Sequence, residues 1–224
     1  MSALQLTWLL LAKDLKLAAR SRELLAVTMM FSVLCVLVFS FGFLQSGAAA
    51  MRYVPGVLWV TLLFSSSVSL LRLFSAEEES GTLPLVSMTS AGSAPLFWSK
   101  AITQLLFTTV VCALVLPLVL LFFDATIRNP GAVAAALTLG LIGQAVLGTL
   151  CAALLAQVHL REVLLPLVLY PTLAPLLIAG VKVTALSLSD AQQPAVSSWL
   201  TLMMVFDLIF VVASPWLHSR ATQP

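Results

Sequence analysis

The sequence predicts an all-α integral membrane protein with six transmembrane helices, an N-terminal amphipathic helix at the membrane interface, and a short cytoplasmic helix between the second and third spans. Of the 224 residues, 61% are hydrophobic and only 9% are charged, whereas soluble domains contain roughly 25% charged residues. Six windows reach the length of about 20 mostly apolar residues that a spanning helix needs. Alternating segments typical of a membrane β-barrel are absent, which leaves helices as the structure that satisfies the backbone in lipid.

The six windows and their connections account for the chain as one transmembrane domain, residues 1–224. The expected spans lie at approximately 24–44, 54–74, 101–123, 132–156, 163–186 and 197–217. With the N-terminus in the cytoplasm, eight of the eleven Lys and Arg residues fall on inner segments. The positive-inside rule therefore predicts a multi-pass protein with both termini in the cytoplasm, in agreement with an even number of spans.

Residues 3–20 predict an amphipathic helix ahead of the first span. At about 100° per residue, its apolar side chains share one face: Leu4, Trp8, Leu11, Leu15 and Ala18. Its cations share the opposite face: Lys13, Lys16 and Arg20. Such a helix is typical of the membrane interface, where cations meet anionic headgroups. We predict a membrane-surface role for Trp8 and the three cations, the alternative being a cytoplasmic helix packed on its own protein.

The segment 75–93 connects the second and third spans and begins with three consecutive acids: Glu77, Glu78 and Glu79. These acids are unfavourably placed, because they follow the C-terminal end of a helix and lie near a negatively charged inner leaflet. A basic partner surface would compensate their charge. Gly81 permits a sharp turn, after which a short helix can lie on the membrane surface and end at Gly92. The alternative is a solvated loop with scattered acids.

The fourth span carries a stripe of small residues at every fourth position, interrupted by one glutamine. The stripe consists of Ala132, Ala136, Gly140, Gln144, Gly148, Ala152 and Ala156. Small residues let helix backbones approach closely in lipid, and a glutamine among them can form a hydrogen bond across the contact. The stripe predicts tight helix packing, against either another span of this chain or a second copy.

Two further features of the spans each leave two interpretations open. Asp207 lies near the middle of the last span, where a carboxylate is costly, so it belongs either to a substrate path or to an interhelical hydrogen bond. The fifth span contains Pro166, Pro171 and Pro175. Each removes a backbone donor and tends to kink the helix, which is compatible with a hinge or with a static bend.

The sequence contains no recognisable catalytic or nucleotide-binding motif. No Lys follows a Gly, so a P-loop is absent, as are HExxH and GxSxG. We therefore expect no enzymatic activity, no metal site and, at a formal net charge of +2, no nucleic-acid partner. The two histidines, His159 and His218, are expected to be solvated groups at helix ends rather than haem ligands.

Several motifs together resemble the B subunit of the haem exporters used in cytochrome c maturation, a family of ABC-2-type membrane subunits. The motifs are Leu-Ala-Lys-Asp-Leu at 11–15, Pro-Gly-Val-Leu-Trp-Val at 55–60, Arg-Leu-Phe at 72–74, the acids followed by Gly81-Thr82-Leu83, Leu165-Pro166, Pro-Thr-Leu-Ala-Pro-Leu-Leu-Ile at 171–178, and Ser214-Pro215. Length, span count and motif order agree along the whole chain. Two positions depart from the family pattern, because Leu71 and Pro84 stand where acids are common.

The resemblance implies a transport role in the bacterial inner membrane. It implies a separate cytoplasmic ATPase subunit, a second copy of this chain, a haem-handling membrane protein and a periplasmic haem chaperone as partners. Residues 75–93, with Glu77–Glu79 and Gly81-Thr82-Leu83, would couple to the ATPase. Haem would be cargo of the complex rather than a covalent cofactor, and ATP would act only through the partner.

Two alternatives to this function stay open. One is a self-contained secondary carrier that uses Asp207 as a proton site. The other is a membrane assembly scaffold that transports nothing. Within the exporter interpretation, the chain either moves haem itself or drives release of the loaded haem chaperone.

Overall fold

The computed structural model describes residues 3–20, 22–43, 51–74, 94–156, 158, 160–189 and 193–221. Within these ranges every regular element is an α-helix, and six helices are long and apolar enough to cross a membrane. The predicted all-α class and the number of spans are therefore confirmed, whereas the expected short helix between the second and third spans lies outside the described residues. The helices are α1 (Ala3–Arg20), α2 (Arg22–Gly42), α4 (Val54–Leu71), α7 (Ala94–Phe122), α8 (Pro130–Leu155), α9 (Arg161–Leu188) and α10 (Gln193–Ala221).

The largest difference from the expected bounds is at the start of α7. This helix begins at Ala94 rather than near residue 101, with Pro95 in its first turn, where the missing N–H of proline does no harm. Lys100 consequently lies inside the helix and is buried, although a charged residue at this point in the sequence resembles the edge of a span.

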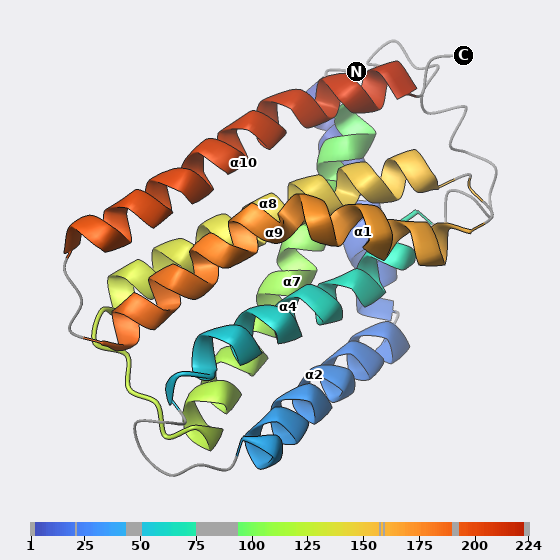
Figure 1. Ribbon diagram of the computed structural model, residues 1–224. Helices are drawn as coiled ribbons and strands as arrows, with labels where there is room; N and C mark the ends of the chain where they lie inside the picture. Colours follow the sequence, from blue (N-terminus) through green and yellow to red (C-terminus); the bar gives the residue numbers. More distant parts are fainter. Residues whose placement is uncertain are drawn as a thin grey trace.

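Successive spans run in alternating directions, so the end of α4, the start of α7, the end of α8, the start of α9 and the end of α10 share one end of the bundle (Figure 1). Helix α1, drawn in violet behind the others, lies at this end and packs chiefly against α7. Helices α4 and α8 are the most enclosed spans, whereas α2 and α10 are the most exposed. The residues exposed on these outer spans are mostly apolar, as contact with lipid requires.

The centre of the bundle is occupied by Trp59 of α4, which is 2% exposed. Its ring lies directly over Gly140 of α8 and Gly180 of α9, so that a Cβ atom at either glycine would overlap the indole. The indole N–H donates a hydrogen bond to Thr184 Oγ1 at 3.0 Å. Trp59 therefore holds three spans together through both shape and a polar contact.

The small-residue stripe of α8 meets α4 of the same chain. A Cβ atom on Gly148 would come within 2.7 Å of Leu70 Cδ1, and Gly140 faces Trp59, which lies about three turns earlier on α4. Ala136 and Ala152 on the same stripe are buried as well. The alternative left open by the sequence, another span of this chain or a second copy, is answered for the two glycines by these contacts.

Candidate functional site

The acidic residues of the connecting segment, Glu77, Glu78 and Glu79, lie outside the described residues, as do Gly81, Thr82 and Leu83. The structure does describe the two points at which the segment 75–93 is attached. One is Phe74, just beyond the end of α4, and the other is Ala94, the first residue of α7. Phe74 belongs to a compact group of buried side chains, and Ala94 lies three residues before Phe97, a second member of that group.

We call this group the root cluster and define it as Asp14, Phe74, Phe97, Lys100 and His218. All five residues are buried. The Lys100 ammonium lies 3.1 Å from Asp14 Oδ1 and 5.7 Å from the centroid of the Phe74 ring. The Phe97 and His218 rings are tilted against each other with centroids 5.6 Å apart. The cluster thus joins α1, the end of α4, the start of α7 and the end of α10.

Helix geometry places two of these side chains on one face of α7. Phe97 and Lys100 are three residues apart on α7, and residues with this spacing lie on the same face of a helix. Pro95 starts the helix early enough to complete this turn. If α7 began near residue 101, as the hydropathy of the sequence alone indicates, neither side chain would have a fixed direction.

The Asp14–Lys100 pair is buried on both sides, with side chains 4% and 3% exposed. Removing a single ion from water costs several kcal/mol, so a buried charge persists only when it is paired. The Phe74 ring gives Lys100 a second favourable contact through its π-face. Within the described residues Asp14 Oδ2 has no hydrogen-bond partner, while the half-exposed Lys13 ammonium lies 3.6 Å from Oδ1.

This ion pair was missed by the interpretation of the sequence. Asp14 entered only as part of a family motif, and Lys100 was counted as a loop cation. One signal was present, because Asp14 lies three residues after Leu11 and four before Ala18, on the border of the apolar face. A carboxylate beside an apolar face indicates a buried partner. The expectation for His218 was wrong, since this side chain is buried against Phe97 rather than solvated.

Helix α1 shows one of the two alternatives that the sequence left open, which is packing on its own protein, and the interfacial alternative is untested. It packs on its own protein through Leu11 and Asp14, which are both buried. It also leaves Trp8 71% exposed and Leu4 82% exposed on the neighbouring face, and Lys13 and Lys16 are exposed too. The side chain of Arg20 lies outside the described residues. A membrane-surface role for Trp8 and the cations stays a prediction.

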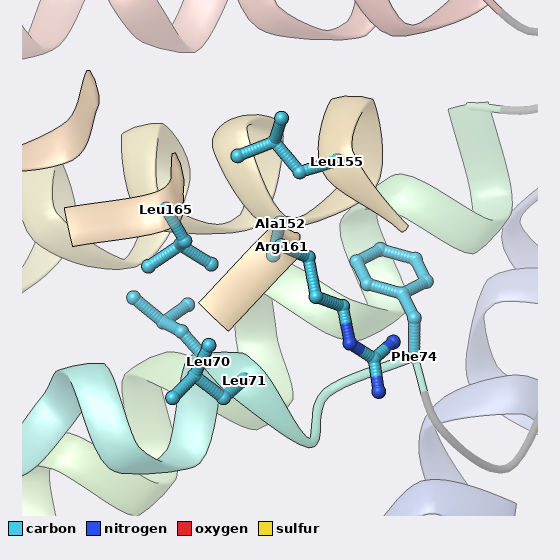
Figure 2. A pocket seen from close by; sticks show the side chains of 7 residues that line it. All are labelled: Leu70, Leu71, Phe74, Ala152, Leu155, Arg161 and Leu165. Atoms are coloured by element: carbon cyan, nitrogen blue, oxygen red, sulfur yellow. The ribbon is translucent and has the colours of Figure 1, made fainter. Parts of the chain in front are cut away.

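A second cation lies close to the root cluster, at the start of α9. Figure 2 shows Arg161 extending toward Phe74 within a small pocket. The pocket is lined by Leu70, Leu71, Phe74, Ala152, Leu155, Arg161 and Leu165. Leu71 stands where the resemblance would place an acid, and it lines the same pocket as the Arg161 guanidinium. Phe74 therefore has a cation from α7 and a cation from α9 in its surroundings.

Gln144 lies in a polar network that connects α4 to its neighbours inside the bundle. Its amide group donates to Ser66 Oγ and is 3.5 Å from Leu62 O. On α7, Gln104 accepts a hydrogen bond from Ser69 Oγ at 2.9 Å and donates to Ser66 O at 3.2 Å. The serines of α4 thus face glutamines on both α7 and α8, an arrangement that satisfies polar groups away from water.

Replacing Gln144 by leucine is expected to lower the free energy of unfolding by about 1 kcal/mol, because interhelical hydrogen bonds in membrane proteins contribute roughly 0.6 and at most about 1.7 kcal/mol. Titration with sodium dodecyl sulfate in mixed micelles measures the change. The matched control is Thr138→Val on the same helix, since the exposed Thr138 hydroxyl bonds only to Ala134 O of its own helix. Equal effects of the two substitutions would contradict an interhelical role for Gln144.

Asp207 and the three prolines have clear positions in the bundle. The Asp207 side chain is buried and lies against Gly143 of α8, where a Cβ atom would overlap it. Among the described residues neither of its carboxyl oxygens has a hydrogen-bond partner. Helix α9 is continuous, with Pro171 and Pro175 exposed and Pro166 half-buried. The roles of Asp207 in a substrate path and of the prolines as hinges stay predictions.

The six spans and the enclosed polar network define a multi-pass integral membrane protein. The comparisons with known proteins then identify its family: the family model described as CcmB protein matches residues 5–223, and the chain belongs to that family. It is 30% identical over 175 residues to "Heme exporter protein B" of Paracoccus denitrificans, covering 76% of this chain and 78% of the relative. It is 27% identical over 192 residues to the protein of the same name from Pseudomonas aeruginosa, covering 86% of each.

Proposed function

We propose that this chain is the membrane subunit of an ABC-type haem exporter that acts in c-type cytochrome biogenesis. The observation that carries the proposal is the family match over residues 5–223, together with relatives named for haem export at similar length. The chain would lie in the bacterial inner membrane with both termini in the cytoplasm. Its partners would be a separate ATPase subunit, a second copy of itself, a haem-handling membrane protein and a periplasmic haem chaperone.

The proposed mechanism is mechanical. The ATPase binds the segment 75–93, with Glu77–Glu79 facing a basic surface and Gly81-Thr82-Leu83 forming the turn into the short helix. Closure of the ATPase moves this segment, and the movement reaches the bundle at Phe74 and Ala94. The root cluster supports this step, because buried, closely packed groups transmit displacement rather than absorb it. From Phe74 and Lys100 the movement passes to α4 and α7, and haem is cargo of the assembled complex.

Replacing Glu77, Glu78 and Glu79 together by glutamine is expected to weaken association with the ATPase by at least about tenfold, since truncating charges at a complementary interface costs a few kcal/mol. Copurification from cells that coexpress both subunits measures association, and ATP hydrolysis by the purified complex measures coupling. Glu162→Gln is the matched control, because Glu162 is an exposed acid at the start of α9, outside the segment. Unchanged association and unchanged hydrolysis in the triple variant would refute docking at this segment.

The same preparation separates the exporter from its two alternatives. An ATPase variant that binds but does not hydrolyse ATP should abolish cytochrome c maturation if the chain belongs to an ABC exporter. A scaffold would tolerate that variant. A secondary carrier would move haem in liposomes that contain this chain alone under a proton gradient, and replacing Asp207 by asparagine would stop it.

Cysteine labelling tests the proposed orientation. In a variant whose native Cys35, Cys112 and Cys151 are replaced by alanine, a cysteine at position 85 should react with a membrane-impermeant maleimide only after the inner membrane is permeabilised. A cysteine at the exposed Thr126, in the α7–α8 connection, should react in intact cells and serves as the control. The positive-inside distribution of Lys and Arg is the physical reason. The reverse labelling pattern would overturn both the orientation and the coupling role of the segment 75–93.

A further inference from the structure

We propose that Asp14 and Lys100 are positioning residues that make α1 a part of the coupling element. The ion pair fixes α1 to the first turns of α7, and Phe74 beside the same ammonium connects that point to the end of α4. This inference rests on the proposed function and deepens it, because it adds a third helix to the two from which the segment 75–93 emerges.

The convergence of three segments on one ammonium group carries the inference. Lys100 Nζ lies 3.1 Å from Asp14 Oδ1 of α1 and 5.7 Å from the Phe74 ring centroid. Phe74 is the last described residue before the segment 75–93, and Lys100 lies within the first two turns of the helix that follows it. A displacement of either attachment point of the segment therefore acts on a side chain that is ion-paired to α1.

A buried ion pair is better suited to this task than an apolar contact. An apolar contact between helices in lipid is held by van der Waals packing, without a hydrophobic driving force. Sliding α1 along α7 would separate Asp14 from Lys100 and leave two unpaired buried charges, which is far more costly. A buried polar contact between helices is a well-attested way to fix register. The pair thus selects one position of α1 relative to α7.

The outward face of α1 indicates what the Asp14–Lys100 ion pair would connect to the moving segment. Leu4 and Trp8 are largely exposed beside the inward-facing Leu11 and Asp14, and Lys13 and Lys16 are exposed as well. In the interface these side chains hold α1 at the level of the lipid headgroups. A helix held by lipid on one side and by Lys100 on the other gives the moving segment a support in the plane of the membrane.

The first experiment needs only the purified chain in nanodiscs and measures whether the Asp14–Lys100 ion pair immobilises α1. A spin label at Leu9, an exposed position on α1, reports the mobility of this helix. In the Asp14→Leu/Lys100→Met variant, which replaces the charges by apolar groups of similar size, the label should become more mobile. The exchanged pair Asp14→Lys/Lys100→Asp should restore wild-type immobilisation, and Lys16→Met is the matched cation control. Wild-type immobilisation in the apolar variant would overturn the inference.

The second experiment measures coupling in the complete complex with its ATPase. In the apolar variant, the amount of cytochrome c matured per ATP hydrolysed should fall at least about fivefold, a coupling loss of ordinary size, while the abundance of the complex is retained. The exchanged pair should restore most of the ratio. A merely structural pair would lower abundance and maturation together and leave the ratio unchanged, which would overturn the positioning role. If the wild-type chain bound no ATPase, the proposed function would fail. The spin-label result would still decide whether the Asp14–Lys100 pair holds α1 on α7.

Discussion

Replacing Trp59 by alanine is expected to lower the free energy of unfolding by about 3–5 kcal/mol, the range for removing a large aromatic side chain from a packed interior. Trp59 is 2% exposed, and its ring fills the space above two glycines. The neighbouring Gly140 and Gly180 cannot fill the cavity that the substitution leaves, because neither has a side chain. The substitution also removes the N–H donor to Thr184 Oγ1. Unfolding in mixed micelles with increasing sodium dodecyl sulfate measures the loss.

The opposite substitution should also destabilise the bundle, by a smaller amount. In Gly140→Ala the new Cβ atom would overlap the Trp59 ring, so either the indole or the backbone of α8 must shift, and overpacking of this kind costs roughly 1–3 kcal/mol. Gly56→Ala is the control, since a Cβ atom there meets nothing within 4 Å. Trp216→Ala controls for the loss of a tryptophan, because Trp216 is largely exposed on α10. A Trp59→Ala variant no less stable than Trp216→Ala would mean that the three spans are held together elsewhere.

Replacing Lys100 by methionine is expected to destabilise the protein by about 3 kcal/mol, the lower end of the range for breaking a buried ion pair. The cost arises because the Asp14 carboxylate stays buried after its main partner is gone. We expect the lower end because the Lys13 ammonium remains 3.6 Å from Asp14 Oδ1 and is half-exposed. The same denaturation measurement in micelles applies, with Lys16→Met as the control for loss of an exposed cation.

The double variant Asp14→Leu/Lys100→Met should recover most of this stability. Replacing both partners of a buried pair by apolar groups is often neutral, whereas removing one partner is not. The difference between the double variant and the sum of the single variants gives the coupling between the two residues. Additive effects would show that the charges do not interact across the α1–α7 contact.

The spans could be predicted from the sequence because their signal is local. Length and apolar composition alone distinguish a membrane helix from its connections, and the six expected spans match the six long apolar helices among the described residues. The start of α7 was misplaced for the same reason. A window centred near Lys100 contains a charge, and local hydropathy cannot register that the charge is neutralised by Asp14, 86 positions earlier in the chain.

The sequence could predict which face of a helix packs closely, but it could not predict which helix packs against that face. Periodicity identified the stripe with Gly140 and Gly148 as a close contact, because spacing along one helix is visible in the sequence. It could not identify α4 as the opposite surface, because the periodicity of α8 carries no information about which helix supplies Trp59 or Leu70. Likewise, the positions of Pro171 and Pro175 marked possible bends, but which side of α9 faces its neighbours depends on the whole bundle.

The serines of α4 have a consequence for how the chain is made. This helix and α8 have the lowest mean hydropathy of the six spans and are also the most enclosed. When α4 enters the bilayer, α7 and α8, which carry Gln104 and Gln144, have not yet followed it. Until they arrive, the hydroxyls of Ser66 and Ser67 can turn back to Leu63 O of their own helix, as they also do in the finished bundle. We expect these two hydroxyls to be satisfied within α4 while it enters the bilayer, and α4 to reach its final position only after α8 has been inserted.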